Sequence, residues 1–230
     1  MSVTITSIAG GAPKPVFDRL GPIYGRASGN KLNALYDSMS GIASRVTARE
    51  ALDVLLMPVA TIERYIKQGI VQGACTPLAN IGLAVGVTAG TPVPDVSTPE
   101  ALRAALIAAK GVVHAPPTAT PSGAQSDTVI KELGLAGKIA VSHKVGLAGG
   151  LAAIASGDAS LGIFPKSEIV SVKGIALAGP LPPSLQLVIT YGAGVTAWSK
   201  VATEAAEFIR FIVTPESRTI WNECGFDPPA

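Results

Sequence analysis

The chain has 230 residues, 18 Lys and Arg against 16 Asp and Glu for a formal net charge of +2, and 48% hydrophobic residues. This composition excludes intrinsic disorder, which needs low hydrophobicity or a large net charge. The balanced charge, the lack of a Lys/Arg cluster and the small number of aromatic residues (Phe 5, Trp 2, Tyr 4) argue against nucleic acid as a partner.

Short apolar runs alternate with helical patterns along the whole chain, which predicts strands covered by helices. The expected strands are residues 3–8, 31–35, 53–57, 81–87, 112–115, 139–142, 160–164 and 185–197. The expected helices are residues 13–27, 40–48, 58–68, 97–110, 121–133, 147–156, 201–213 and 214–225. The helix over 97–110 has the clearest signals, with a Thr98 cap, Pro99 in the first turn and Gly111 as its stop.

This regular alternation predicts an α/β protein with mostly parallel sheets flanked by helices on both faces. Candidate breaks lie near residues 78–82 and 183–187. If both are hinge crossings, residues 1–80 and 187–230 form lobe I and residues 81–186 form lobe II. A single continuous sheet would contradict this expectation.

Membrane and export signals are absent from the sequence as given. The two long uncharged stretches, residues 68–94 and 174–199, are interrupted by Gly, Pro and Thr, so neither predicts a transmembrane helix. The first residues have neither the basic nor the apolar region of a signal peptide. We therefore expect a cytoplasmic protein, or a periplasmic one if the sequence is a mature form.

The cysteines and histidines predict neither a metal site nor a cofactor. Cys75 and Cys224 are compatible with one disulfide, but two buried thiols are the simpler expectation. His114 and His143 stand apart from each other and from both cysteines, so no cluster with metal-ligand spacing exists.

Four strand-to-helix junctions are rich in small residues and hydroxyls: residues 9–13, 38–41, 118–123 and 146–150. Free N–H groups at a helix start bind anions, and small side chains let a ligand approach the backbone. Open α/β sheets bind ligands at this edge. Each loop taken alone is also explained as an ordinary turn or cap.

The order of motifs resembles the molybdate-binding branch of the bacterial solute-binding proteins. The residues that carry the resemblance are Val3-Thr4-Ile5, Ser38-Met39-Ser40-Gly41, Leu52-Asp53-Val54-Leu55-Leu56, Pro121-Ser122-Gly123, Gly157-Asp158-Ala159-Ser160-Leu161-Gly162 and Val213-Thr214-Pro215-Glu216-Ser217. The resemblance spans nearly the whole chain. It implies a type II periplasmic-binding-protein-like fold of two lobes, with an anion held between them by hydroxyls and backbone N–H groups.

The first loop departs from the family pattern. Molybdate binders typically offer a serine there, whereas this chain has Gly10-Gly11-Ala12 and then Lys14. The variant resembles a side branch of the family that includes aconitate isomerase. One hydroxyl ligand is missing and a lysine follows, so a carboxylate suits the site better than molybdate.

The candidate substrate-binding residues are Gly10, Gly11, Lys14, Ser38, Ser40, Arg45, Ser122, Gly149 and Lys166, and the candidate catalytic residue is His114. Some have plainer alternatives. Lys14 also fits a solvated surface charge, Arg45 also fits an ion pair with Glu50 or Asp53, and His114 also fits a packed core histidine.

Two functions remain open. The first is binding of a small anion, an oxyanion or preferably an organic di- or tricarboxylate, by a monomer that would serve an ABC transporter permease if it is secreted. The second is proton transfer on an unsaturated polycarboxylate, as in aconitate isomerisation, with His114, His143, Lys14 or Glu168 as the base.

Overall fold

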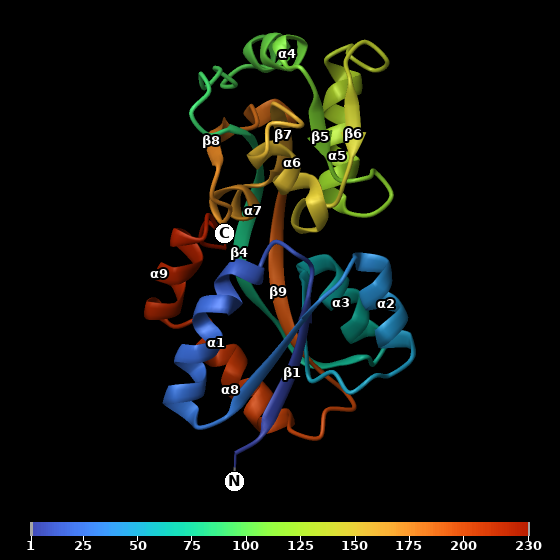
Figure 1. Ribbon diagram of the computed structural model, residues 1–230. Coiled ribbons are helices and arrows are strands. Elements are labelled where there is room, and N and C mark those ends of the chain that lie inside the picture. Colours follow the sequence, from blue (N-terminus) through green and yellow to red (C-terminus); the bar gives the residue numbers. More distant parts are fainter. Residues whose placement is uncertain (1, 230) are drawn as a thin grey trace. The chain divides into compact units, whose positions relative to one another are not determined.

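The computed structural model describes residues 2–229, which fold into two compact units (Figure 1). Unit 1 runs to Ile81 and resumes at Ile189, and unit 2 comprises Gly82–Val188. The chain thus passes between the units one or two residues after the predicted breaks at 80/81 and 186/187.

Unit 1 is built on a mixed sheet in the order β2-β1-β3-β9-β4. Its strands are β1 (Thr4–Ala9), β2 (Lys31–Tyr36), β3 (Val54–Pro58), β4 (Val71–Thr88) and β9 (Val188–Thr196), of which β4 and β9 extend into unit 2. Its helices are α1 (Lys14–Ser28), α2 (Met39–Thr47), α3 (Val59–Lys67), α8 (Ala202–Phe211) and α9 (Pro215–Glu223). Strand β1 is parallel to β2 and β3, and β9 is antiparallel to β3.

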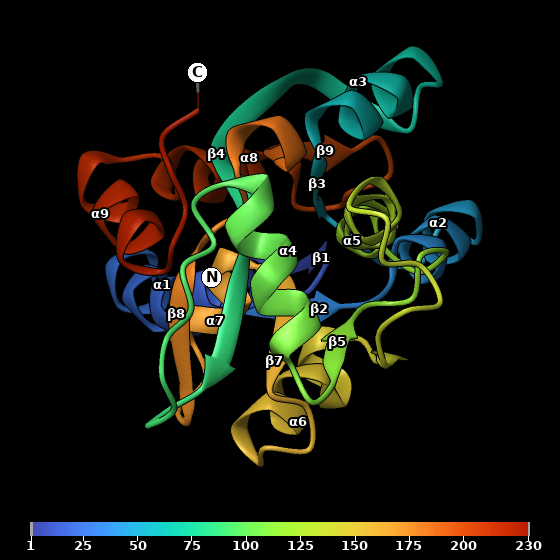
Figure 2. The same ribbon diagram turned by 90° about the horizontal axis from the view of Figure 1, so that it is seen from above.

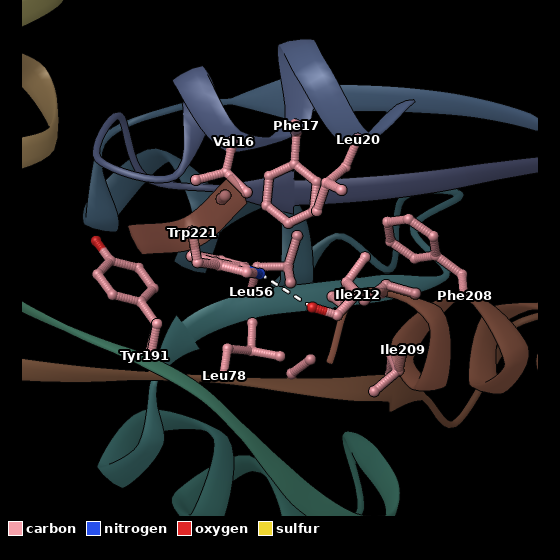
Figure 3. Close-up of a cluster of buried hydrophobic side chains, with 14 of the residues drawn as sticks. Val16, Phe17, Leu20, Leu56, Leu78, Tyr191, Phe208, Ile209, Ile212 and Trp221 are labelled. Atoms are coloured by element: carbon pink, nitrogen blue, oxygen red, sulfur yellow. Dashed lines mark hydrogen bonds between the residues drawn. The ribbon is translucent and has the colours of Figure 1, made fainter. Parts of the chain in front are cut away.

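Helices cover both faces of this sheet because successive strand residues point to opposite sides. In β3, Val54 and Leu56 join a core cluster with α1, α8 and α9, whereas Leu55 and Met57 join a second cluster with α2 and α3. Figure 3 shows the first cluster, in which the indole Nε1 of Trp221 donates a hydrogen bond of 3.0 Å to the carbonyl of Ile212.

Unit 2 repeats this plan in the order β8-β4-β7-β5-β6. Its further strands are β5 (Val112–His114), β6 (Val141–His143), β7 (Leu161–Pro165) and β8 (Ile175–Pro180), and its helices are α4 (Pro99–Ala108), α5 (Pro121–Glu132), α6 (Leu151–Ala155) and α7 (Lys166–Val170). Strands β6, β5 and β7 are parallel, and β4 is antiparallel to β7 and β8. Because β4 belongs to the strand orders of both units, the strands form one nine-stranded sheet, and the expectation that no continuous sheet would occur is wrong, although the chain still divides into two compact units.

The sheet of unit 2 is also covered on both faces (Figure 2). Leu161 and Ile163 of β7 pack with α4 and α5, and Phe164 packs with α6 and α7. The parallel strands of each unit therefore end at one edge, where the loops to α1, α2, α5, α6 and α7 begin.

Four features differ from the sequence prediction. Strand β4 starts at Val71, ten residues earlier than expected, because its exposed first half contains Gly73 and Pro77 and has no apolar alternation. Helix α7 and strand β8 were not predicted. The helix expected over 147–156 is instead a π-type turn, Gly146–Gly150, followed by α6, because Gly149 has φ +111°.

Cys75 and Cys224 are free thiols, and Cys75 is only half-buried. Within residues 2–229, no helix is long and apolar enough to cross a membrane.

Candidate functional site

Helix α2 of unit 1 begins with two adjacent hydroxyls. Ser38 is its N-cap, and the Ser38 Oγ accepts a hydrogen bond of 3.1 Å from the backbone N–H of Gly41. The Oγ of exposed Ser40 lies 3.1 Å from the Oγ of Ser38. A Cβ at Gly41 would overlap the carboxylate of Asp37, so a larger residue here would displace that side chain.

Helix α5 of unit 2 begins in the same way. Thr120 is its N-cap, and the Thr120 Oγ1 accepts a hydrogen bond of 3.0 Å from the N–H of Gly123. The Oγ of Ser122 lies 2.9 Å from Thr120 Oγ1, and Ser122 is 7% exposed. A Cβ at Gly123 would overlap the carbonyl oxygens of Ala115 and Pro116. The two units thus share the arrangement Ser/Thr-x-Ser-Gly at a helix start that follows a parallel strand.

The first loop of unit 1 places Lys14 beside an aromatic ring. Gly10 and Gly11 follow β1, and Lys14 is the first residue of α1. The Lys14 ammonium forms an ion pair of 2.6 Å with Asp18 and lies 5.6 Å from the ring centroid of Tyr36. This exposed pair within one helix leaves Lys14 near the carboxyl ends of β1 and β2.

Arg45 is held by carboxylates of its own unit. Its Nε lies 3.1 Å from Asp37 Oδ2, and its Nη1 lies 3.1 Å from Glu50 Oε2. The expected ion pair of Arg45 with Glu50 is therefore present. The second partner of Arg45 is Asp37 and not Asp53. Asp53 instead accepts hydrogen bonds from the N–H of Thr6 and the hydroxyl of Ser199. These two ion pairs occupy the guanidinium of Arg45 within its own unit.

His114, the last residue of β5, is fully buried. Its Nδ1 lies 2.8 Å from the carbonyl oxygen of Ala115, so Nδ1 carries the proton and Nε2 keeps a free lone pair. Burial lowers the pKa of His114 and keeps the imidazole neutral. The ring of exposed His143 meets it edge-on, with ring centroids 4.7 Å apart.

The last two candidates also follow strands of unit 2. The sequence predicted Gly149 at the start of a regular helix. The structure places it inside the turn Gly146–Gly150 instead. Lys166 is half-buried and is the first residue of α7, directly after β7.

Three buried polar side-chain atoms among residues 2–229 lack a hydrogen-bond partner: Tyr36 Oη, His114 Nε2 and Ser167 Oγ. Tyr36 ends β2, His114 ends β5, and Ser167 lies two residues after β7. Unsatisfied buried polar groups are uncommon and call for an explanation. All three lie at carboxyl ends of parallel strands, where open α/β sheets bind ligands.

Sequence reasoning missed Tyr36 and Ser167. Tyr36 directly follows a predicted strand and precedes the hydroxyl-rich loop, which was an available signal. Burial raises the pKa of the Tyr36 phenol, so it stays a hydrogen-bond donor at neutral pH. Ser167 lies in a helix that the sequence did not reveal.

Residues 5–227 match the model of a family described as bacterial extracellular solute-binding protein. The chain belongs to this family. The resemblance inferred from the sequence is thereby confirmed.

A curated relative of this solute-binding family member is an aconitate isomerase from Pseudomonas sp., which is 23% identical over 238 residues, 98% of this chain and 88% of the relative. Among solved structures, the periplasmic molybdate-binding protein of Azotobacter vinelandii has a TM-score of 0.82 at 16% identity, covering 98% of this chain and all of that one. The substrate-binding domain of a putative molybdenum ABC transporter from Clostridium difficile has a TM-score of 0.78 at 18% identity over the full length of both chains. These structural similarities confirm the predicted two-lobed α/β fold class.

Proposed function

We propose that this protein binds a small organic anion with two or three carboxylates, and that the start of α2 in unit 1 and the start of α5 in unit 2 each present hydroxyls and backbone N–H groups for an anion. The observation that carries the proposal is the repeated arrangement of two hydroxyls, a side-chain cap and a glycine at both helix starts. The unpartnered Tyr36 Oη, His114 Nε2 and Ser167 Oγ support it, because a ligand at this edge would give them partners.

A carboxylate fits these residues better than a small tetrahedral oxyanion. The first loop offers Gly10, Gly11 and Ala12 without a hydroxyl, and a site that lacks one hydrogen-bond partner discriminates strongly against the ligand that needs it. Lys14 follows, and its exposed pair with Asp18 is worth only about 0.3–0.5 kcal/mol, so a ligand carboxylate competes for its ammonium.

Solute binding also implies where the protein acts and which class of partner it has. A member of an extracellular solute-binding family would act outside the cytoplasmic membrane, as a monomer that delivers its ligand to an ABC transporter permease. The similar structure from Clostridium difficile is the substrate-binding domain of a putative molybdenum ABC transporter, which supports this class of partner.

Calorimetry tests the ligand class directly. We expect citrate, cis-aconitate or trans-aconitate to bind more tightly than sulfate and molybdate at equal concentration. A submicromolar Kd for molybdate, together with no heat from the three carboxylates, would overturn the carboxylate assignment while leaving anion binding in place. No heat from any of the five would contradict anion binding itself.

An allylic isomerase is the second candidate, favoured by the aconitate isomerase that aligns with 98% of this chain. His114 has the protonation state that a base requires, because its neutral imidazole keeps the Nε2 lone pair free. In this reading, Nε2 takes a proton from a carbon next to a carboxylate and returns it across the allylic system, while the helix starts hold the flanking carboxylates.

Proton NMR of cis-aconitate incubated with the protein separates the two functions. An isomerase converts it to trans-aconitate, and His114→Asn, which keeps a donor for the Ala115 carbonyl, lowers kcat with little change in KM. Ser40→Ala raises KM instead. If cis-aconitate binds and persists unchanged, the protein is a binding protein.

A further inference from the structure

Glu168, one of the candidate bases in the sequence, is a buried acid to which neither proposed function assigns a role. It is the third residue of α7 and is 8% exposed. Its carboxyl lies against Gly146, where any Cβ would overlap Glu168 Oε2, and close to the ring of Phe164. Among the described residues, no side chain forms an ion pair or a hydrogen bond with this carboxyl.

The elements around Glu168 hold no charge that could balance an ionised carboxylate. Helix α7 packs against β7 and β8, and it adjoins α6 and the turn Gly146–Gly150. None of these four segments contains a titratable side chain. The charged residues at their ends are Lys144, Lys166 and Lys173, and none of them contributes to the shift in the pKa of Glu168. Burial alone raises that pKa to about 7.

Among the segments around Glu168, the turn Gly146–Gly150 is the one that can move most easily. Three of its five residues are glycines, and Gly149 has φ +111°. An ionised carboxylate requires water or a cation, and moving the turn away from α7 would admit water to it. Ile169, the next residue of α7, packs into an apolar cluster.

We propose that Glu168 is a positioning residue whose neutral carboxyl holds the Gly146–Gly150 turn against α7, and that loss of its proton releases the turn. In this step the carboxyl of Glu168 loses one proton to water and keeps one negative charge. The turn follows β6, the strand paired with β5, so it shares an edge with the start of α5. The consequence for ligand affinity rests on the proposed function, because a displaced turn and a new negative charge both disfavour an anion there.

The test of the turn itself needs no ligand. Amide NMR signals of Gly146, Gly149 and Gly150 are followed from pH 5.5 to 8.5 in the parent and in Glu168→Gln, which imitates the neutral acid. We expect one shared titration near pH 7 in the parent and none in the variant. His143 is the matched control, because its exposed imidazole lies only three residues before the turn. The transition should persist in His143→Gln.

Glycine signals that do not titrate in the parent, or that titrate equally in Glu168→Gln, would overturn the proposal. If Glu168→Gln fails to fold, Glu168→Met supplies a neutral side chain of similar length for the same comparison.

A second measurement links the turn to the site. Citrate affinity should fall by about fivefold or more from pH 6 to pH 8.5 in the parent and should stay nearly constant in Glu168→Gln. An equal fall in both proteins would contradict the link to binding. If citrate does not bind at any pH, the carboxylate assignment fails, and the glycine signals still decide whether Glu168 controls the turn.

Discussion

The side-chain amide of Gln186 pairs with the backbone of Leu83 as a neighbouring strand would. Gln186 Oε1 accepts a hydrogen bond of 2.7 Å from the Leu83 N–H, and Gln186 Nε2 donates one of 2.9 Å to the Leu83 carbonyl. Both residues belong to unit 2, and each lies within a few residues of a point where the chain passes between the units. On the unit 1 side, Asn80 Oδ1 accepts a 2.7 Å hydrogen bond from Thr190 Oγ1. These bonds tie both crossing segments together within each unit.

Replacing Gln186 by leucine should destabilise the protein by about 1–3 kcal/mol, because it removes the side-chain partner of the Leu83 N–H in a half-buried position. Urea unfolding measures the change. Gln125→Ala is the control, since it loses a single bond to the Leu185 carbonyl and should cost less. Equal stability of Gln186→Leu and the parent would show that water replaces the amide without loss.

Ser40→Ala and Ser122→Ala should each weaken binding of the carboxylate ligand by about 1–3 kcal/mol, roughly 5- to 150-fold in Kd, because each removes a hydroxyl from a helix start. Calorimetry with the ligand found in the panel measures the effect. Ser44→Ala and Thr128→Ala are matched controls, because their hydroxyls bond carbonyls one turn back in α2 and α5. If both test variants bind as tightly as the parent, these helix starts are only turns.

Gly123→Ala should destabilise the fold by about 2 kcal/mol or more, since its Cβ would overlap two backbone carbonyl oxygens that cannot move aside cheaply. Gly25→Ala, inside α1, should stabilise it by about 0.5–1 kcal/mol, because its Cβ meets the Asn30 carbonyl oxygen at an ordinary 3.4 Å. Thermal unfolding compares the two variants. A stabilising Gly123→Ala would show that the start of α5 tolerates a side chain.

Glu168 makes stability fall as pH rises. Its folded pKa of about 7 lies above its ordinary value of 4.5, so the folded state binds more protons than the unfolded state between these values. The penalty is absent below about pH 4.5, grows up to about pH 7 and is complete above it. Glu168→Gln should therefore gain up to about 3 kcal/mol over the parent at pH 8 relative to pH 4.5. Urea unfolding at both values measures the gain, and an identical pH dependence of both proteins would contradict it.

Local interactions explain which elements were predictable. Helices α4, α5 and α9 begin with a threonine cap and a proline, and each cap bonds an N–H only three residues away. The α/β class followed from the alternation of such helices with apolar strands, the two-lobed solute-binding fold was implied by the family resemblance, and both are confirmed. The first half of β4 was not predictable, because its exposed residues carry no pattern and it is a strand only through pairing with β9.

The sequence by itself determined the fold class, most helix boundaries and the hydroxyl-rich loops, because caps, periodicity and turn residues act over three or four positions. Only the tertiary structure decided the partners of the candidate residues. Arg45 lies between two carboxylates, and His114 Nε2 has no hydrogen-bond partner. The carboxyl of Glu168 lies against Gly146, which is 22 positions earlier in the chain. Burial and the loss of water depend on which distant segments pack together, and no local pattern encodes that packing.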